Sequence, residues 1–291
     1  MIPLPSINSN TVHHRLYTST MVFLQPYKLG VANANANNNI RDRKSLQQIL
    51  FFLHTLYLFT ANDFLTFAIP TTVFGLFGAL SGPILSTNSS PAILPIVFRV
   101  PQTLLITWLN LLIFTVSNQS NPAGLAQDRI NHPHRPIPRG RITAAAARDL
   151  LLFVVPTVCA AGWLLCIWQE TLLLLVAEWM YNDLNGSDAH FLLRNGLNSL
   201  RYALYSDIAL RVMVGREYAL KTEGIQWLII VGLVMFFTQY ICDVKDLQGD
   251  RATGRKTVPV VLGDGVARWC VAVAVVLSCC RAVLCCLSQV L

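Results

Sequence analysis

Long apolar stretches recur along this chain of 291 residues, and they restrict its fold more than any other feature. A membrane-spanning helix needs roughly 20 predominantly apolar residues. Hydrophobic residues make up 54% of the chain and charged residues only 13%, whereas about 25% is usual in a soluble domain. This composition excludes a disordered protein and argues against a soluble enzyme. We therefore expect an all-α fold, a polytopic membrane helical bundle.

Seven apolar segments are candidate membrane spans. They cover residues 64–80, 92–116, 143–161, 163–180, 190–214, 225–241 and 266–287. Residues 46–61 are apolar but contain Gln47, Gln48 and His54, which favours a helix at the membrane interface, with Asn62-Asp63 as the N-cap of the first span. Residues 1–45 are Asn-rich and are expected to form a disordered cytosolic tail ahead of a membrane domain over 46–291.

Basic residues gather between the apolar segments, and the net charge is +7. The clusters lie in 41–44, 129–148 and 245–256. An even number of predicted spans separates each pair of clusters, so all three fall on one face, which the positive-inside rule makes cytosolic. This pattern explains the basic balance by membrane orientation and without nucleic acid. We expect an integral protein of the endoplasmic reticulum, with both polar loops facing the cytosol.

The polar loop after residue 241 carries three carboxylates at helical spacing. Asp243, Asp246 and Asp250 lie at offsets of 0, 3 and 7, which on a helix places them on one face. Three like charges at this spacing need a counter-ion, and carboxylate oxygens suit Mg²⁺, which often also binds phosphate. Basic residues that could contact the same anion follow, namely Arg251, Arg255 and Lys256. A solvated helix end beside the membrane is the alternative interpretation.

The loop over residues 117–141 holds a second group of polar residues. It contains Asn118-Gln119, then Asp128, Asn131 and Arg135. His132 and His134 could suggest a metal, but they flank Pro133 and cannot share a helical face. The prolines are more typical of a helix end.

The two polar loops resemble the two signatures of the UbiA superfamily of intramembrane prenyltransferases. Residues 128–141 read DRINHPHRPIPRGR, and residues 243–251 read DVKDLQGDR, followed by TVPVVLG at 257–263. The motifs lie in this order about four spans apart, and the resemblance covers roughly residues 46–291. It implies a helical bundle whose central cavity holds an isoprenyl diphosphate through Mg²⁺. It also implies metal ligands and catalytic residues at Asp243, Asp246, Asp250 and Asp128.

The first motif departs from the family pattern, which is an Asn-Asp pair, an Asp three residues later and another four after that. Counting back from Asp128 puts Gly124 and Asn121 where acids belong, and Asn118-Gln119 stands two residues too far upstream. Gln127 adds another amide. The Asn-Gln pattern resembles a fungal subgroup that includes membrane-bound terpene cyclases of the bergamotene-forming type. The family bundle also has nine spans against seven here, so a truncated, inactive membrane protein is one alternative.

The weakest predicted span, 190–214, carries a polar stripe with offsets of 0, 4, 7 and 11. The stripe consists of Arg194, Asn198, Arg201 and Tyr205. Charged residues in a span normally face the bundle interior or an aqueous cavity, where this stripe could meet a diphosphate. A helix lying partly in the interface is an equal alternative. Among the aromatic residues, Tyr240 is the one we expect to shield a carbocation by cation–π contact, because it lies one turn before Asp243.

Three functions are compatible with these features. The first is a Mg²⁺-dependent terpene cyclase of secondary metabolism that acts on farnesyl diphosphate. The second is a prenyltransferase that joins the prenyl group to an aromatic or other acceptor, and the third is the inactive protein. The expected substrate-binding residues are Asn118, Gln119, Arg135, Arg194, Asn198, Arg201, Tyr205, Tyr240, Arg251 and Lys256.

Overall fold

The computed structural model describes residues 34–290, with side chains from Ser45 to Cys280. Apart from an isolated β-bridge between Ser86 and Leu220, the regular structure in this range is helical. This confirms the all-α prediction. Most of the predicted tail, residues 1–33, lies outside the described residues, and the boundary at residue 45 stays a prediction.

The chain divides into two compact units, residues 1–53 and 54–291. The described part of the first unit is the beginning of helix α2 (Ala34–Asp63). In the second unit, α2 continues through a π-helical turn, η1 (Phe64–Ala68), into α3 (Ile69–Leu80). The predicted break at Asn62-Asp63 is therefore wrong: Asp63 stays helical and makes no capping hydrogen bond. The apolar pattern on both sides continues the helix through this point.

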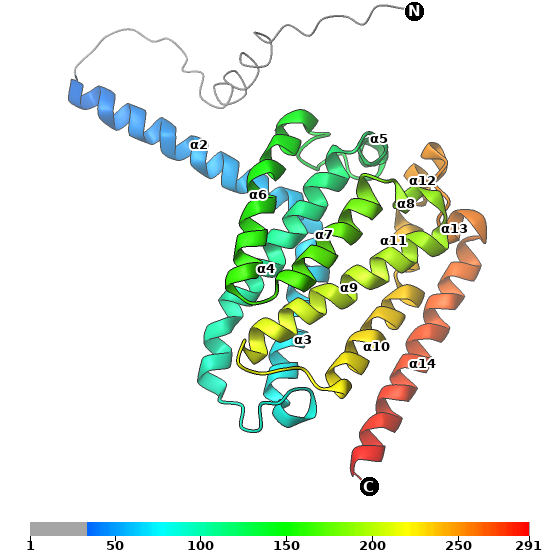
Figure 1. Cartoon of the computed structure of the whole chain (residues 1–291). Coiled ribbons are helices and arrows are strands. Elements are labelled where there is room, and N and C mark those ends of the chain that lie inside the picture. The colour runs from blue at the N-terminus through cyan, green and yellow to red at the C-terminus, as the bar shows by residue number, and fades with distance from the viewer. Residues whose placement is uncertain (1–33, 291) are drawn as a thin grey trace, which may run out of the picture. The chain divides into compact units, whose positions relative to one another are not determined.

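The rest of the second unit is a bundle of helices joined by short helical connections (Figure 1). A 3₁₀ turn, η2 (Gly82–Ile84), follows α3. The longer helices are α4 (Ile93–Ser120), α6 (Ala144–Leu164), α7 (Trp168–Asn182), α9 (Phe191–Val214), α10 (Thr222–Thr238) and α14 (Asp264–Val290). The shorter ones are α5 (Pro122–Asn131), α8 (Gly186–Ala189), α11 (Tyr240–Lys245), α12 (Leu247–Thr253) and α13 (Val258–Val261).

Local sequence explains several helix starts. The Asn121 side chain accepts a hydrogen bond from the backbone N–H of Ala123, and Pro122 occupies the first position of α5, where its missing N–H costs nothing. Thr143 caps α6 in the same way through Ala146 N–H. The Asn121 cap starts α5 directly after α4, so the first motif folds back over the end of the bundle.

Helix α9 is the central element of the second unit and packs against α3, α4, α7, α8 and α10. Its contact with α3 is close because Gly75 faces it: a Cβ at Gly75 would lie 2.6 Å from the carbonyl oxygen of Ala209. Small residues allow helices in membranes to approach in this way. Tyr205 and Arg201 of α9 are fully buried. The polar stripe thus faces the bundle interior and not the membrane interface.

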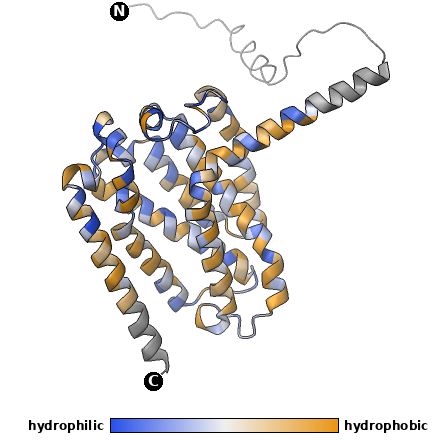
Figure 2. Cartoon of the chain, turned by 180° about the vertical axis from the view of Figure 1, so that it is seen from behind, coloured by the Kyte–Doolittle hydropathy of each residue, from blue (hydrophilic) through white to orange (hydrophobic). Residues whose placement is uncertain are grey.

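Four helical segments are long and apolar enough to cross a membrane among the residues whose side chains are described. They are Ser45–Leu80, Ile93–Ser120, Ala144–Leu164 and Thr222–Lys245. Helix α7 has only 15 residues, about 22 Å, and α9 carries several charges. Seven spans therefore stay a prediction. Figure 2 shows hydrophobic residues along the long helices and hydrophilic residues gathered at the end where α5, α8 and α12 lie.

Candidate active site

A polar pocket of about 140 Å³ lies where the two motif loops meet. Helix α5 of the first loop packs against α12 of the second, so the two loops lie side by side at one end of the bundle. Predicted site residues that line the pocket are Asn118, Gln119, Asp128, Arg135, Arg194, Asp246 and Asp250. The lining also includes Asp63, Phe114, Thr115, Gln127, Asn131, His132, Tyr181 and Arg255.

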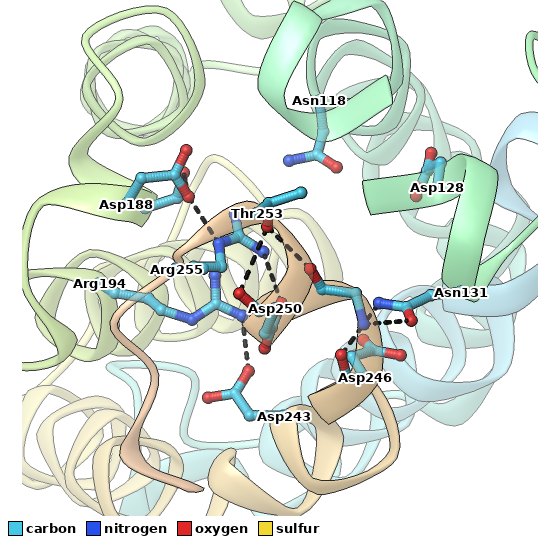
Figure 3. A network of polar contacts seen from close by, with 12 residues as sticks. Asn118, Asp128, Asn131, Asp188, Arg194, Asp243, Asp246, Asp250, Thr253 and Arg255 are labelled. Carbon is cyan, nitrogen blue, oxygen red and sulfur yellow. Dashed lines mark hydrogen bonds and ion pairs between the residues drawn. The ribbon is translucent and has the colours of Figure 1, made fainter. Parts of the chain in front are cut away.

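The second motif is split at Asp246. Helix α11 ends and α12 begins there, with Asp246 at φ −94° and ψ 4°, so the three carboxylates do not lie on one continuous helix as spacing predicted. Asp246 and Asp250 line the pocket, whereas Asp243 lies behind it, buried. One oxygen of Asp243 is 2.6 Å from Arg194 Nη2. Figure 3 shows these groups converging around Asp250.

Several buried carboxylate oxygens at this end of the bundle accept no hydrogen bond from the described residues. They are Oδ2 of Asp128, Oδ2 of Asp243 and both oxygens of Asp250. Buried polar atoms normally have a partner, so these oxygens are suited to a ligand such as a cation. No three His, Cys, Asp or Glu side chains among residues 45–280 are arranged to enclose a metal by themselves. The unpartnered carboxylate oxygens are hard ligands of the kind Mg²⁺ takes, one or two at a time, alongside phosphate oxygens and water.

The first motif contributes mostly amides, and these are already engaged. Asn118 Nδ2 donates to Asn182 Oδ1 at 3.0 Å, and Gln119 Nε2 donates to the backbone oxygen of Phe59 at 2.9 Å. Asp128 is the only acid of this motif and lies 2.6 Å from Arg135 Nη1. The amide and carboxylate oxygens that remain are the groups this side can offer a ligand.

Gly124, which stands where the family pattern has an acid, packs against the backbone of the preceding helix. A Cβ at this position would overlap the carbonyl oxygen of Asn118. The close return of α5 onto α4 therefore excludes any side chain at Gly124. The other expected acid position, Asn121, serves as the α5 cap and donates to the Asn182 carbonyl at 2.8 Å.

Asn131 joins the two loops, a role that its sequence position did not reveal. Its Nδ2 donates to the backbone oxygen of Asp246 at 3.0 Å, and its Oδ1 accepts from Gly249 N–H at 3.0 Å. His132 Nε2 lies 3.3 Å from Asp246 Oδ1. These contacts fix the second motif against the first. Asn131 could have been noticed only by knowing that the loops touch.

Besides Arg135, two arginines bring positive charge to the pocket. Arg194 donates to Tyr181 Oη at 2.7 Å as well as to Asp243. Arg255 donates to Asp188 at 2.6 Å and lies 3.8 Å from Asp250. Both side chains are about one-tenth exposed. They are placed to contact an anion that enters the pocket.

The other predicted substrate-binding residues lie outside the pocket lining. Asn198, Arg201 and Tyr205 lie deeper along α9, Tyr240 is buried against Val258 and Ala267, and Arg251 and Lys256 are exposed. Arg251 follows Asp250 on α12, and one helical step of about 100° turns it away from the pocket. Arg251 and Lys256 therefore do not line this pocket, and their role in substrate binding stays a prediction.

The pKa values of the carboxyl groups in the two loops are shifted in different directions. Burial raises the pKa of Asp250 to about 6, although the charges of Arg194 and Arg255 act against it. Burial likewise raises the pKa of Asp128, against the charge of Arg135. Burial also acts on Asp246, but the hydrogen bond and charge of His132 outweigh it, so the pKa of Asp246 is lowered.

Residues 68–291 match the model of the UbiA prenyltransferase family. The chain belongs to this family. The match contains both motif loops and all the helices from α3 onward, so the UbiA resemblance of the sequence is confirmed. Membership also makes the chain an integral membrane protein of a family of enzymes.

Two curated relatives are similar over most of the chain. Somaliensene A/B synthase of Streptomyces somaliensis is 28% identical over 73% of this chain and 66% of its own length. Fumagillin beta-trans-bergamotene synthase of Aspergillus fumigatus is 30% identical over 76% of this chain and 71% of its own length. The chain thus spans just under two thirds of the first relative.

The fold is similar to that of a UbiA homologue from Archaeoglobus fulgidus whose structure was solved with GPP and Mg²⁺. The TM-score is 0.60 and the sequences are 16% identical, with 77% of this chain and 74% of that chain covered. At this identity the comparison establishes the shared fold.

Proposed function

We propose that this protein is a Mg²⁺-dependent terpene cyclase that ionises and cyclises farnesyl diphosphate in secondary metabolism. The observation that carries the proposal is a group of buried carboxylate oxygens on Asp128, Asp243 and Asp250 that find no hydrogen-bond partner among residues 45–280. They stand beside the arginines of the same pocket. The pocket therefore offers oxygen acceptors for a cation and N–H donors for an anion. A metal–diphosphate ligand requires both.

Asp246 and Asp250, with Asp243 behind them, would hold Mg²⁺ on one side, and Asp128 would hold it on the other. When bound, Mg²⁺ neutralises diphosphate charge and makes it a better leaving group. Arg194, Arg255 and Arg135 would donate to the same phosphate oxygens. Phe114 and Tyr181 form part of the pocket lining. They would help exclude water from the carbocation that is left on the prenyl chain when the diphosphate departs.

The cyclase is favoured over other prenyl chemistry by two features. The first motif is rich in amides, which favours a single anion site in the pocket. One anion site is enough for a cyclase, because a cyclase needs only one bound substrate. The Streptomyces and Aspergillus relatives described above carry the names of synthases, one of them for a bergamotene. We also propose that the protein resides in the endoplasmic reticulum with the motif loops facing the cytosol, because of the basic clusters.

A prenyltransferase with a separate acceptor is the second candidate. It is favoured by Arg201, which is fully buried and has two guanidinium nitrogens without hydrogen-bond partners among the described residues. A buried guanidinium could bind the carboxylate of an aromatic acceptor. A transferase must then hold both molecules with the reacting atoms roughly 3–3.5 Å apart.

The two candidates are separated by adding one substrate at a time. Microsomes that contain the protein are incubated with farnesyl diphosphate and Mg²⁺ alone, with geranylgeranyl diphosphate in parallel, and volatile and extracted products are analysed. The proposal predicts cyclic hydrocarbons without an acceptor. Product that forms only after an aromatic acceptor is added would overturn the cyclase in favour of the transferase.

A further inference from the structure

A second polar cluster lies beneath the pocket, among apolar helices. It consists of Glu178 on α7 with Tyr205 and Arg201 on α9, whose exposed fractions are 2%, 0% and 0%. We propose that Glu178 is the group that accepts the proton at the end of the reaction. The inference rests on the cyclase function proposed above and adds to it the residue that converts the final cation into a hydrocarbon.

Glu178 has one occupied and one free carboxylate oxygen. Tyr205 Oη donates to Glu178 Oε1 at 2.9 Å, whereas Oε2 is buried and has no hydrogen-bond partner among the described residues. A buried carboxylate is unfavourable unless it is paired and fully hydrogen-bonded. The Tyr205 hydrogen bond fixes the side chain and leaves Oε2 available, which is the arrangement a proton acceptor needs.

The cluster lies directly inward of the pocket. Tyr181, which lines the pocket, is three residues beyond Glu178 on α7, a rise of about 4.5 Å. On α9, Arg201 lies seven residues beyond Arg194, a rise of about 10 Å. The same two helices therefore carry the diphosphate end and the cluster, so a prenyl chain that extends inward from the diphosphate would pass it.

Aromatic rings surround the Arg201 guanidinium of the cluster. The guanidinium carbon of Arg201 lies 3.4 Å from the centroid of the Phe114 ring and 5.3 Å from that of Tyr181. Phe67 stacks on Tyr202 with ring centroids 3.8 Å apart. Rings stabilise a passing cation without reacting with it. Of the groups in the cluster, only Glu178 offers a base, since the guanidinium of Arg201 has no acceptor atom and the Tyr205 hydroxyl is already donating.

The chemistry balances without a further reactant. The allylic C–O bond breaks and its electron pair leaves with the diphosphate. A double bond of the same chain supplies the pair for the new C–C bond, which leaves a cation on another carbon. A neighbouring C–H bond then breaks, its electron pair forms the C=C bond of the product, and the proton goes to Glu178 Oε2. Before the next turnover the proton passes to released diphosphate or to water.

The test compares ionisation with product identity in the full-length protein. Glu178→Gln keeps the size of the side chain and an acceptor for Tyr205 but removes the base. With farnesyl diphosphate and Mg²⁺, we expect diphosphate release within about threefold of wild type, while the wild-type hydrocarbon per diphosphate falls by about tenfold or more. Alcohols, or hydrocarbons that have lost another proton, should replace it. Glu178→Asp, which restores the carboxylate, should recover most of the original product.

Glu170→Gln is the matched control, because Glu170 is also a buried carboxylate of α7 but lies at its other end, paired with Arg211 at 3.0 Å. We expect its product profile to match wild type. An unchanged profile in Glu178→Gln would overturn the proposal. Should that variant fail to accumulate, Tyr205→Phe removes the hydrogen bond that fixes Glu178, and an unchanged profile there would overturn it too.

Failure of the underlying function looks different. If the wild type and Asp246→Asn released diphosphate equally, ionisation at the pocket would itself be refuted, and the role of Glu178 would be refuted with it. Normal diphosphate release with a wild-type profile in Glu178→Gln refutes only the proton acceptor.

Discussion

The two sides of the pocket differ in chemistry although they face the same space. The acid-rich side consists of Asp243, Asp246 and Asp250 from the second motif, and three of their oxygens are buried without a hydrogen-bond partner in the part of the chain that the structure describes. The amide-rich side consists of Asn118, Gln119 and Gln127 with the single acid Asp128. Asp128 is already paired with Arg135. The difference places most of the negative charge available to a cation on the acid-rich side.

The packing of α5 explains how the amide-rich side is maintained. Gly124 cannot carry a side chain because the Asn118 carbonyl occupies that space. Asn121 caps α5 and binds Asn182. The two positions where acids belong thus have structural roles in this chain. The first motif therefore has fewer carboxylates than the family pattern, and the residues at those two positions connect α4, α5 and α7 tightly.

Removal of single acids from the acid-rich side should have the largest effect. Asp246→Asn and Asp250→Asn keep side-chain size but weaken Mg²⁺ binding, and we expect diphosphate release to fall on the order of a hundredfold. The measurement is initial rate at saturating farnesyl diphosphate across Mg²⁺ concentrations. Asp264→Asn, a partly exposed acid paired with Arg268, is the control. Rates within about threefold of wild type would remove these acids from the site.

The two neighbouring arginines should differ in effect. Arg255 lines the pocket and lies 3.8 Å from Asp250, whereas Arg251 is exposed. Arg255→Gln should raise KM for the prenyl diphosphate about tenfold through a lost charge-assisted contact. Arg251→Gln should change KM for the prenyl diphosphate by less than about twofold. Equal effects from both variants would contradict the position assigned to the diphosphate.

An acid added to the amide-rich side should lower the Mg²⁺ requirement, because it supplies a further carboxylate to this side. Asn118→Asp introduces a carboxylate at the pocket wall and should lower the Mg²⁺ concentration for half-maximal rate by about three- to fivefold. Gln102→Glu adds the same charge to α4 sixteen residues away, about 24 Å along the helix, and should leave it unchanged. An unchanged or higher Mg²⁺ requirement in Asn118→Asp would show that the metal does not reach this side.

The smallest expected effect is on stability against pH. Because burial raises the pKa of Asp250 to about 6, protonation favours the folded state. This contribution is complete below the unfolded pKa near 3.8 and is lost as pH rises through about 6. Without Mg²⁺, the wild-type Tm relative to that of Asp250→Asn should therefore fall by about 2–4 °C between pH 5 and pH 7. A constant difference in Tm would contradict the burial of this carboxyl.

The sequence predicted the helical architecture because apolar segments and capping residues act locally. It failed at Asn62-Asp63, where a good N-cap pair lies inside a continuous helix. Asp63 instead lines the pocket, so tertiary position determined its role. The span over α9 looked weak for the same reason, since the partner of Arg194, Asp243, comes from another helix.

The part of the candidate site that lies in the two motifs could be predicted from the sequence. Asp128, Asp246 and Asp250 reach the pocket as their motifs indicated. Asn131 and Tyr181 belong to the site only through contacts between distant segments, which spacing along the chain does not reveal. Arg251 is close in sequence but exposed, because each helical step rotates the side chain by about 100°, and Lys256 is exposed in the connection after α12.

Binding of an uncleavable substrate tests the division between the two sides most directly. Purified protein in detergent is heated with a farnesyl thiodiphosphate analogue, with and without Mg²⁺, and Tm is recorded for wild type, Asp246→Asn and Gln119→Asn. A ligand that binds only the folded state raises Tm. We predict a Mg²⁺-dependent rise that Asp246→Asn abolishes and Gln119→Asn largely retains. A rise that is independent of Mg²⁺, or that survives in Asp246→Asn, would contradict a metal–diphosphate site held by the second motif.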